Sequence, residues 1–444
     1  MKLIHHGGHL GVTGSCHQLW TDDEHSLLVD CGTFQGDDAR DHPNPEIKFS
    51  LRGIESLLLT HVHIDHCGRI PHLIATGFEQ PIYCSGPTAR LLPLVMQDAL
   101  KIGFTRNQRL IDKFNDKIAK LLQPLPYHQW HPIQGGCKLR LRPAGHVLGS
   151  TIFEVELPNG QMAVFSGDLG PRHAPLLTEF SSPERADLLV MESTYGNRIH
   201  EGRADRQSRL EAVLRKTLDD KGVTIIPAFS LGRTQDILFE MNGIFEAIQK
   251  QQGRSLMKQV DVIVDSPLAS RFTQIYDDLQ EFWSAEAQGV LKTDDQPLVF
   301  ENLTTVGDHQ EHLATLDQLV KHKLPAVVVA GSGMCTGGRV MNYLRRLIGE
   351  PTTDIVFCGY QARGTPGSYI QRGSDWVRLD GRKYQIRADV HQLSGYSAHA
   401  DQRDLLRFVA GFTEKPYRIR LVHGEYHVRK ALEAELDQRG YHVD

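Results

Sequence analysis

The sequence predicts an α/β protein with more than one domain, and three observations support this. The chain has 444 residues, more than a single hydrophobic core usually organises. Short apolar runs alternate with segments of helical periodicity, which is the pattern of layered α/β folds. Polar clusters directly follow several of these apolar runs, as expected where loops converge at the carboxyl ends of strands.

The predicted strands fall into two sets. The first set comprises residues 26–30, 55–59, 139–141, 162–165 and 188–191. The second set reads as a mostly parallel sheet of its own, with helical segments such as 233–249 and 339–348 between its strands, at residues 223–227, 260–264, 326–330 and 355–358. A strand at 418–422 and a helix at 426–439 close the chain. Boundaries near residues 196 and 394 therefore divide it into segments 1–196, 197–393 and 394–444.

Composition excludes several classes of protein. Apolar residues make up 40% and charged residues 23% of the chain, which suits a folded enzyme and argues against disorder. No apolar run approaches the roughly 18 to 20 residues of a membrane span, and the N-terminus lacks the apolar core of a signal peptide. The seven scattered cysteines form no CxxC pair, as is typical of reduced thiols. We therefore expect a cytoplasmic protein that does not contact membranes.

The segment His61-Val-His-Ile-Asp-His66 places four potential metal ligands within six residues, directly after a predicted strand. Imidazole nitrogens and carboxylate oxygens are ligands that Zn²⁺ accepts. No helix or strand directs all four side chains to one face, so we expect a tight loop that wraps a metal ion. His61 and His63 can serve one ion while Asp65 and His66 turn towards a second.

Three further residues at strand ends can complete these two sites. His146 is preceded by a glycine, Asp168 follows another strand, and His423 comes from the far C-terminal segment. A carboxylate can bridge two cations, which suits Asp168 to a shared position. The expected ligands are His61, His63, Asp65, His66, His146, Asp168 and His423.

These residues resemble the metallo-β-lactamase superfamily, with its HxHxDH loop and dinuclear site. Three further motifs resemble motifs A, B and C of its β-CASP nucleases, a branch that includes ribonuclease J and the endonuclease subunit of the cleavage-and-polyadenylation machinery. They are Glu192-Ser-Thr-Tyr-Gly196, Ser397-Ala-His-Ala-Asp401 and Val422-His-Gly424. The segments Gly11–Ser15 and Leu28–Gly32 are also typical of that branch.

The resemblance implies an αββα metallo-β-lactamase sandwich interrupted by an inserted α/β β-CASP domain. It implies a first metal site of His61, His63 and His146 and a second of Asp65, His66 and His423, with Asp168 between them. Asp30 is expected to orient a ligand by hydrogen bonding without touching metal. Ligand type favours two Zn²⁺ per chain, with Mn²⁺ as the alternative occupant.

The resemblance also implies hydrolysis of RNA phosphodiester bonds by a hydroxide that the two metals activate, with Asp65 and Asp168 as catalytic ligands. The departing oxygen needs a proton donor, and His399 is our candidate for this role. Glu192 is expected to orient His399 and favour its protonated form. The products would carry 5′-phosphate and 3′-hydroxyl ends.

The inserted domain is expected to hold the substrate. Its strand ends carry Ser and Gly before helices, where backbone N–H groups can bind anions, and arginines that suit phosphate. We expect these groups to track a nucleic-acid backbone in a cleft between the domains, with backbone donors from Ser397 and Ala398. The expected substrate contacts are Ser230, Arg233, Ser332, Arg339, Arg363, Ser397 and Ala398.

Several alternatives stay open at this point. A DNA nuclease of the same branch is disfavoured because DNA-acting members tend to carry an apolar residue where this chain has His423. A small-molecule hydrolase would lack the insertion, and an inactive RNA-binding scaffold would be expected to lose ligands. Endonuclease and 5′-exonuclease modes share this core, so both remain. Single-stranded RNA is the expected partner, and a homodimer is left open.

Overall fold

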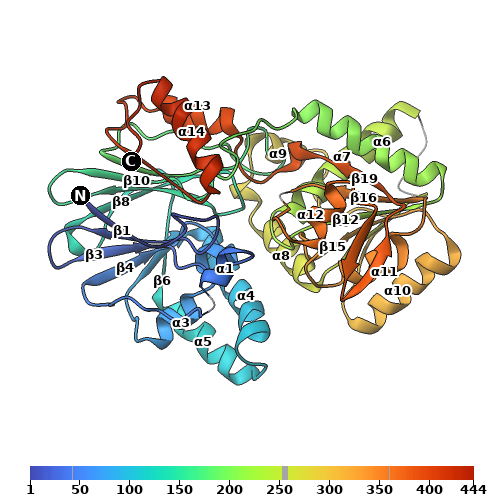
Figure 1. The fold of residues 1–444 in the computed structure, drawn as a ribbon, viewed down its shortest axis with the longest axis horizontal. Coiled ribbons are helices and arrows are strands. Elements are labelled where there is room, and N and C mark those ends of the chain that lie inside the picture. The colour runs from blue at the N-terminus through green and yellow to red at the C-terminus, as the bar shows by residue number, and fades with distance from the viewer. Residues whose placement is uncertain (43, 253–258, 360) are drawn as a thin grey trace. The chain divides into compact units, whose positions relative to one another are not determined.

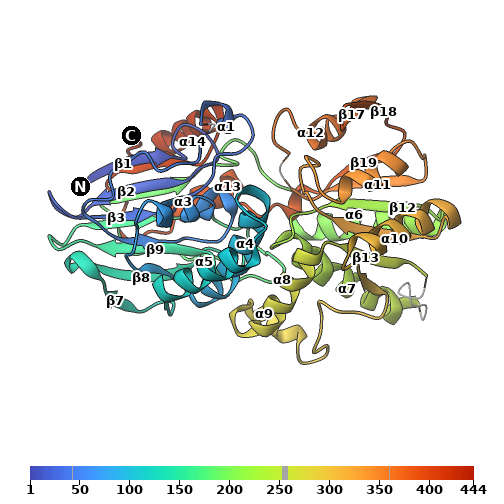
Figure 2. The same cartoon turned by 90° about the horizontal axis from the view of Figure 1, so that it is seen from below.

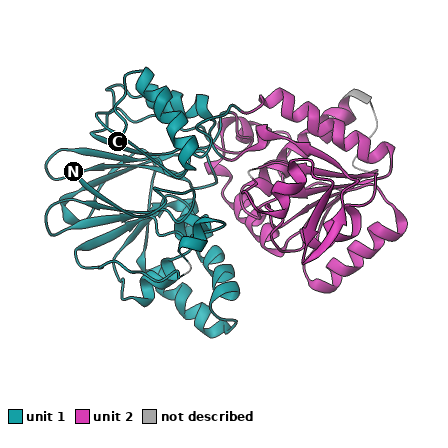
Figure 3. Cartoon of the chain, in the orientation of Figure 1, with its two compact units in different colours: residues 1–172, 178–199, 399–444 teal, residues 173–177, 200–398 magenta. Residues whose placement is uncertain are grey.

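The computed structural model describes residues 1–42, 44–252, 259–359 and 361–444, and these divide into two units (Figure 3). Unit 1 consists of residues 1–172, 178–199 and 399–444, and unit 2 of residues 173–177 and 200–398. Unit 1 is therefore built from segments that precede and follow most of unit 2 in the sequence. Residues 394–398, which the sequence analysis assigns to the C-terminal segment, group with unit 2.

Two sheets pack face to face in unit 1, with helices on their outer sides (Figures 1 and 2). The first sheet has the order β1 (Lys2–Gly7), β2 (Cys16–Trp20), β3 (Ser26–Val29), β4 (Ile54–Leu58), β5 (Ile82–Ser85) and β6 (Leu122–Leu125). The second has the order β20 (Ile419–Val422), β11 (Leu188–Glu192), β10 (Met162–Phe165), β9 (Thr151–Glu156), β8 (Lys138–Pro143) and β7 (Trp130–Pro132).

The helices of unit 1 cover the outer faces of both sheets (Figure 1). Beside the first sheet are α1 (Asp38–Asp41), α2 (Ile64–Cys67), α3 (Ile70–Ala75), α4 (Gly86–Gly103) and α5 (Gln108–Leu121), and beside the second are α13 (Gln402–Ala410) and α14 (Tyr426–Gln438). The space between the sheets is filled by alternate side chains of both, such as Leu27, Leu58, Phe153 and Phe165. These layers confirm the predicted αββα sandwich with an α/β insertion.

Unit 2 contains a parallel sheet with helices on both faces (Figure 1). Its strand order is β14 (Leu303–Thr305), β13 (Asp261–Asp265), β15 (Ala326–Ala330), β12 (Val223–Pro227), β16 (Thr353–Phe357) and β19 (Asp389–Gln392). The central strands are Val- and Ile-rich and almost wholly buried, as a sheet covered on both faces requires. The sheet confirms the second set of predicted strands to within two residues.

The helices of unit 2 are α6 (Arg203–Asp219), α7 (Arg233–Gln252), α8 (Pro267–Asp278), α9 (Ala285–Val290), α10 (His309–His322), α11 (Val340–Leu347) and α12 (Pro366–Gln371). An antiparallel hairpin of β17 (Trp376–Leu379) and β18 (Arg382–Gln385) follows α12. Within the described ranges, no helix combines the length and the apolar character needed to cross a bilayer.

Strand direction explains why distant polar residues of unit 1 meet. β10 and β20 each pair parallel with β11, whereas β9 pairs antiparallel with both β10 and β8. Strands β8, β10, β11 and β20 therefore run in the same direction, and their carboxyl ends share one edge. The loops after β8, β10 and β20 carry His146, Asp168 and His423, and Glu192 is the last residue of β11.

A close backbone contact fixes the segment that carries Asp65 and His66 against the chain after β3. The amides of Cys31 and Thr33 donate to the carbonyl oxygens of His66 (2.8 Å) and Ile64 (2.9 Å). A Cβ atom on Gly32 would lie 1.6 Å from the carbonyl oxygen of Asp65. Only glycine therefore allows these two segments to approach so closely.

We predict that Gly32→Ala lowers the free energy of unfolding by about 1–3 kcal/mol, because the new methyl group forces the two backbones apart. Urea unfolding followed by circular dichroism measures this effect. Gly103→Ala, in the same unit, is the matched control, since a Cβ there meets nothing within 4 Å. Equal stability of the two variants would contradict the steric argument.

Candidate metal centre

Five elements of unit 1 bring the seven predicted ligands to one place. His61 and His63 follow β4, His146 follows β8, Asp168 follows β10 and His423 follows β20. The prediction of a tight loop for the whole His61–His66 segment was wrong in part. Asp65 and His66 lie on the one-turn helix α2, with His63 at its N-cap position. Asp65 and His66 of this turn group with His423, although the ring centroid of His66 also lies 4.1 Å from that of His61.

Asp168 lies between two groups of histidines and faces each with a different oxygen. Its Oδ2 is 3.6 Å from Nε2 of His61 and 3.5 Å from Nε2 of His146. Its Oδ1 is 3.2 Å from Nε2 of His66 and 3.6 Å from Nε2 of His423. The carboxylate therefore reaches both groups at once.

The remaining two ligands complete these groups. Nδ1 of His63 is 2.9 Å from Nε2 of His146, and Oδ2 of Asp65 is 3.3 Å from Nε2 of His423. The donor atoms within each group lie within 4.8 Å of one another. One group is His61, His63, His146 and Asp168, and the other is Asp65, His66 and His423.

The buried donor atoms of these groups fit divalent cations. In the part of the chain that the structure describes, Nε2 of His61, Nε2 of His66 and Oδ1 of Asp168 are buried and make no hydrogen bond of good geometry, although the last two approach to 3.2 Å. Unpaired polar atoms are costly in a protein interior unless something else satisfies them. Nitrogen and oxygen donors gathered in this way match the ligand preference of Zn²⁺. The cluster is therefore a metal-binding site by its chemistry.

Electrostatics differ between the two groups. Burial lowers the pKa of His63 to about 4 and lowers that of His61 well below its usual range, so both are neutral, as ligands must be. Burial opposes charge on His423 too, but the carboxylates of Asp168 and Asp65 outweigh it and raise its pKa to about 9. The second group thus attracts positive charge more strongly than the first.

Asp30 lies behind His66 and does not belong to either group of donor atoms. Its Oδ2 accepts a hydrogen bond from Nδ1 of His66 at 2.7 Å, which turns Nε2 of that ring towards Asp168. Thr60 holds the carboxylate in place through its amide and its hydroxyl, both at 2.8 Å. The backbone of Asp30 has φ = 58°, a costly conformation that these bonds offset.

His423 is held by residues that the sequence analysis missed. Its backbone also adopts a left-handed conformation (φ = 52°), and its amide donates to the carbonyl oxygen of Gly8 at 2.6 Å. The Thr194 hydroxyl is 3.0 Å from Nδ1 of His423. Thr194 lies within the Glu192–Gly196 motif, so its position was visible in the sequence although its task was not.

His399 and Glu192 lie beside Asp168. Nδ1 of His399 is 3.3 Å from Oε1 of Glu192 and 3.9 Å from Oδ2 of Asp168. The Glu192 carboxylate also accepts hydrogen bonds from the amides of Leu169 (2.6 Å) and Thr194 (3.3 Å), which fix its orientation. Asp401 caps α13 through the amide of Asp404, so His399 stands immediately before a rigid helix start. His399 is the more exposed of the pair, at 18% against 1%.

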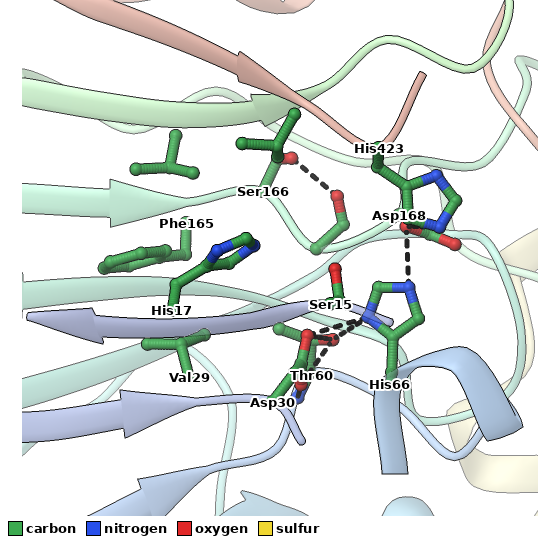
Figure 4. A pocket seen from close by; sticks show the side chains of 13 residues that line it. Ser15, His17, Val29, Asp30, Thr60, His66, Phe165, Ser166, Asp168 and His423 are labelled. Atoms are coloured by element: carbon green, nitrogen blue, oxygen red, sulfur yellow. Dashed lines mark hydrogen bonds and ion pairs between the residues drawn. The ribbon is translucent and has the colours of Figure 1, made fainter. Parts of the chain in front are cut away.

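A cavity of about 20 Å³ lies against the second group of ligands (Figure 4). This volume suffices for one water molecule. Besides apolar side chains from both sheets, it is lined by Ser15, His17, Asp30, Thr60, His66, Ser166, Asp168 and His423. His17, on β2, is a second residue that the sequence analysis missed, because nothing in the pattern of that strand separates it from its neighbours. Its Nδ1 lies 2.8 Å from Nδ1 of His5.

The predicted substrate residues all lie in unit 2, in differing surroundings. Arg233 is buried with Nη1 3.1 Å from Asp236, and Arg339 donates to Asp265 at 2.6 Å and to the carbonyl oxygen of Val306. Their charges are already paired within the unit, which argues against phosphate binding by these two. Arg363 is exposed, as expected for such a role.

The small residues of the predicted substrate set lie in the loops after the unit 2 strands. The Ser230 hydroxyl is 3.0 Å from that of Ser266, the N-cap of α8, and Ser332 accepts a hydrogen bond from the amide of Thr336 at 3.0 Å. Ser397 is buried, and Ala398 is partly buried.

Three family models match the chain: the metallo-beta-lactamase superfamily at residues 11–227, the Beta-Casp domain at 234–370, and the Zn-dependent metallo-hydrolase RNA specificity domain at 383–444. Ribonuclease TTHA0252 of Thermus thermophilus is 35% identical over all of this chain and 97% of its own length. Transcription termination factor FttA of Methanosarcina mazei is 30% identical over 94% of this chain, which spans 66% of that protein.

A solved structure agrees at the level of the fold. The crystal structure of a protein of unknown function from Enterococcus faecalis V583 superposes with a TM-score of 0.51 at 13% identity, covering 99% of this chain and 96% of the other. The near full-length match to the Thermus protein, together with the three successive family models, confirms the resemblance that the motifs indicated. This chain belongs to the β-CASP branch of the metallo-β-lactamase superfamily.

Proposed function

We propose that this chain is a metal-dependent ribonuclease that hydrolyses RNA phosphodiester bonds. The observation that carries the proposal is the position of Asp168, whose two oxygens face two histidine groups while His399 and Glu192 stand beside it. The relative from Thermus thermophilus is named a ribonuclease, which supports RNA as the substrate. His423 at motif C favours RNA over DNA for the reason given above.

In this proposal two divalent cations occupy the site, Zn²⁺ by preference of the ligands and Mn²⁺ as the alternative. His61, His63 and His146 would hold one ion, and Asp65, His66 and His423 the other, with Asp168 shared. When bound, two such cations lower the pKa of water and neutralise the charge that develops on a phosphoryl group. The hydrogen bond that His66 donates to Asp30, and the contact of His423 with the Thr194 hydroxyl, would keep the two rings aimed at their ion.

His399 would give a proton to the departing oxygen. Glu192 holds Nδ1 of the ring, so Nε2 is the nitrogen that exchanges a proton with the substrate. Partial exposure of His399 suits a group that must meet a substrate entering from solvent, whereas Glu192 is enclosed. Ser230, Ser332, Arg363, Ser397 and Ala398 remain candidates for holding the RNA strand.

Two finer points belong to the same proposal. All seven cysteines are buried free thiols, which supports a cytoplasmic location. A single-stranded RNA substrate is part of the proposal.

We predict that Asp168→Asn lowers RNA cleavage by about 10³-fold, because several kcal/mol of charge stabilisation is lost with the shared carboxylate. Metal analysis of the purified variant should find fewer than two ions per chain. Circular dichroism serves as the control for folding. Full metal content and wild-type cleavage would contradict the shared role of Asp168.

For His399→Gln we expect a different outcome, in which cleavage falls by about 10²- to 10⁴-fold while two metal ions per chain remain bound. Cleavage of end-labelled RNA and metal analysis of the same preparation separate these effects. Loss of metal in this variant would show that His399 acts as a ligand, and unchanged cleavage would remove it from the mechanism.

Chelation of the wild type should abolish cleavage, and adding back Zn²⁺ or Mn²⁺ should restore it, because every proposed step depends on the cation pair. The assay compares one RNA with single-stranded DNA of the same sequence. Preferential cleavage of RNA is expected. Equal cleavage of DNA would contradict the substrate argument, and activity that survives chelation would contradict the metal mechanism.

A further inference from the structure

The hairpin of β17 and β18 in unit 2 has two very different faces. Val377 and Leu379 point inwards and are almost wholly buried, where they join the core of unit 2 together with Ile370. The outward face carries Trp376, Arg378, Lys383 and Gln385, all of which are exposed. Apolar packing on the inner face accounts for the stability of the hairpin, so the outer residues are available for another role.

The register of the hairpin places two positively charged residues opposite each other. Arg378 pairs directly with Lys383 across the strands. Like charges at directly opposed positions of an antiparallel pair destabilise it. A neutral pair at these positions would make the hairpin more stable. The arrangement therefore points to a negatively charged partner that removes the repulsion.

Residues 372–387 hold five cations and two acidic residues, Asp375 and Asp380. Asp380, at the turn, is paired with Arg345 of α11 at 2.6 Å, which leaves Asp375 as the acidic residue of the segment that takes part in no ion pair with another described residue. Among the ion pairs of the described ranges, none involves the five cations of this segment, which are Arg372, Arg378, Arg382, Lys383 and Arg387. The hairpin therefore keeps an unbalanced positive charge in a chain whose net charge is −5.

An aromatic ring accompanies the charge. Trp376 is 45% exposed, although large aromatic side chains are usually covered, and the Lys383 ammonium lies 4.7 Å from its ring centroid. Proteins that bind single-stranded nucleic acid commonly combine aromatic rings with cations. Bases stack on the rings while the cations contact phosphates.

We propose that the outer face of the β17–β18 hairpin binds single-stranded RNA, with Trp376 stacking on a base and with Arg378 and Lys383 contacting the flanking phosphates. This inference rests on the proposed function, since it takes RNA as the substrate. It adds a contact surface apart from the residues that the motifs indicate. A purely apolar partner would leave the opposed cations unneutralised.

The test is binding of a fluorescein-labelled single-stranded RNA to the full chain, with metal chelated so that no cleavage occurs. Fluorescence anisotropy over a range of salt concentrations gives the affinity and its salt dependence. For Trp376→Ala, Kd should rise about tenfold at every salt concentration, because stacking is lost without loss of charge. Trp376→Phe should bind nearly as the wild type does, since a ring remains.

For the double variant Arg378→Gln/Lys383→Gln, the slope of log K against log salt should become shallower by about 1.4, since each phosphate contact on a single strand contributes about 0.7. Its Tm should equal or exceed that of the wild type because the repulsion is removed, so weaker binding would not reflect unfolding. The matched control is Lys101→Gln/Arg109→Gln, which removes the same charge from exposed positions near the junction of α4 and α5 in unit 1. This control should leave the slope unchanged.

The outcomes separate the two proposals. Wild-type protein that cleaves RNA when loaded with metal, but whose hairpin variants bind as the wild type does, would overturn this inference alone. An equal change of slope in the unit 1 control would also overturn it, because binding would then depend on charge anywhere on the surface. Wild-type protein that neither binds nor cleaves RNA would overturn the proposed function itself.

Discussion

One buried carboxylate organises the site. Asp168 is almost wholly buried and lies within 3.6 Å of four imidazoles, two at each oxygen. A buried charge is stable only where opposite charge or strong hydrogen bonds surround it. The strands β4, β8, β10 and β20 must therefore all end close to this one side chain. Because His423 follows β20, the last strand of the chain, the sandwich is complete only when the segment after unit 2 has returned to pair with β11. The chemistry of the site thus determines the connectivity of the fold around it.

Two residues of unit 1 with left-handed backbone support the same oxygen of this carboxylate, His423 directly and Asp30 through His66. Asp30 and His423 both have positive φ, which costs a residue other than glycine on the order of 1–2 kcal/mol. Each is held by hydrogen bonds that an ordinary conformation would not form: Asp30 to Thr60 and His66, and His423 to Gly8 and Thr194. The strained backbone and the hydrogen bonds that offset its cost lie in the same small region. A substitution of Asp30 or His423 would therefore also disturb the hydrogen bonds that hold its loop.

Much of this arrangement follows from the sequence, and the exceptions have physical causes. The convergence of the seven expected ligands was predictable because polar residues that follow parallel strands meet at one edge of the sheet, and apolar runs such as 162–165 mark those strands. Helix α2 was not predictable, since one turn is too short to display periodicity. The pairing of Arg339 with Asp265 spans 74 positions, and no local pattern reveals such a partner. Strands β1 and β2 were missed because histidines and a glutamine interrupt their apolar pattern.

The distribution of ion pairs tells more about nucleic-acid binding than the net charge does. A chain of net charge −5 repels a polyanion at long range, so affinity must come from cations that are locally unneutralised. Most arginines near the sheets do not qualify: Arg140 and Arg142 share Glu154, Arg206 pairs with Glu240, and Arg233 pairs with Asp236. These cations stabilise the fold, and their charge is neutralised by carboxylates of the same unit. The arginines that suited phosphate by their place in the sequence are thus partly structural, whereas the hairpin, which carries no recognised motif, keeps its charge exposed. Tertiary structure decides which cations have no carboxylate as an ion-pair partner. The sequence therefore does not reveal them.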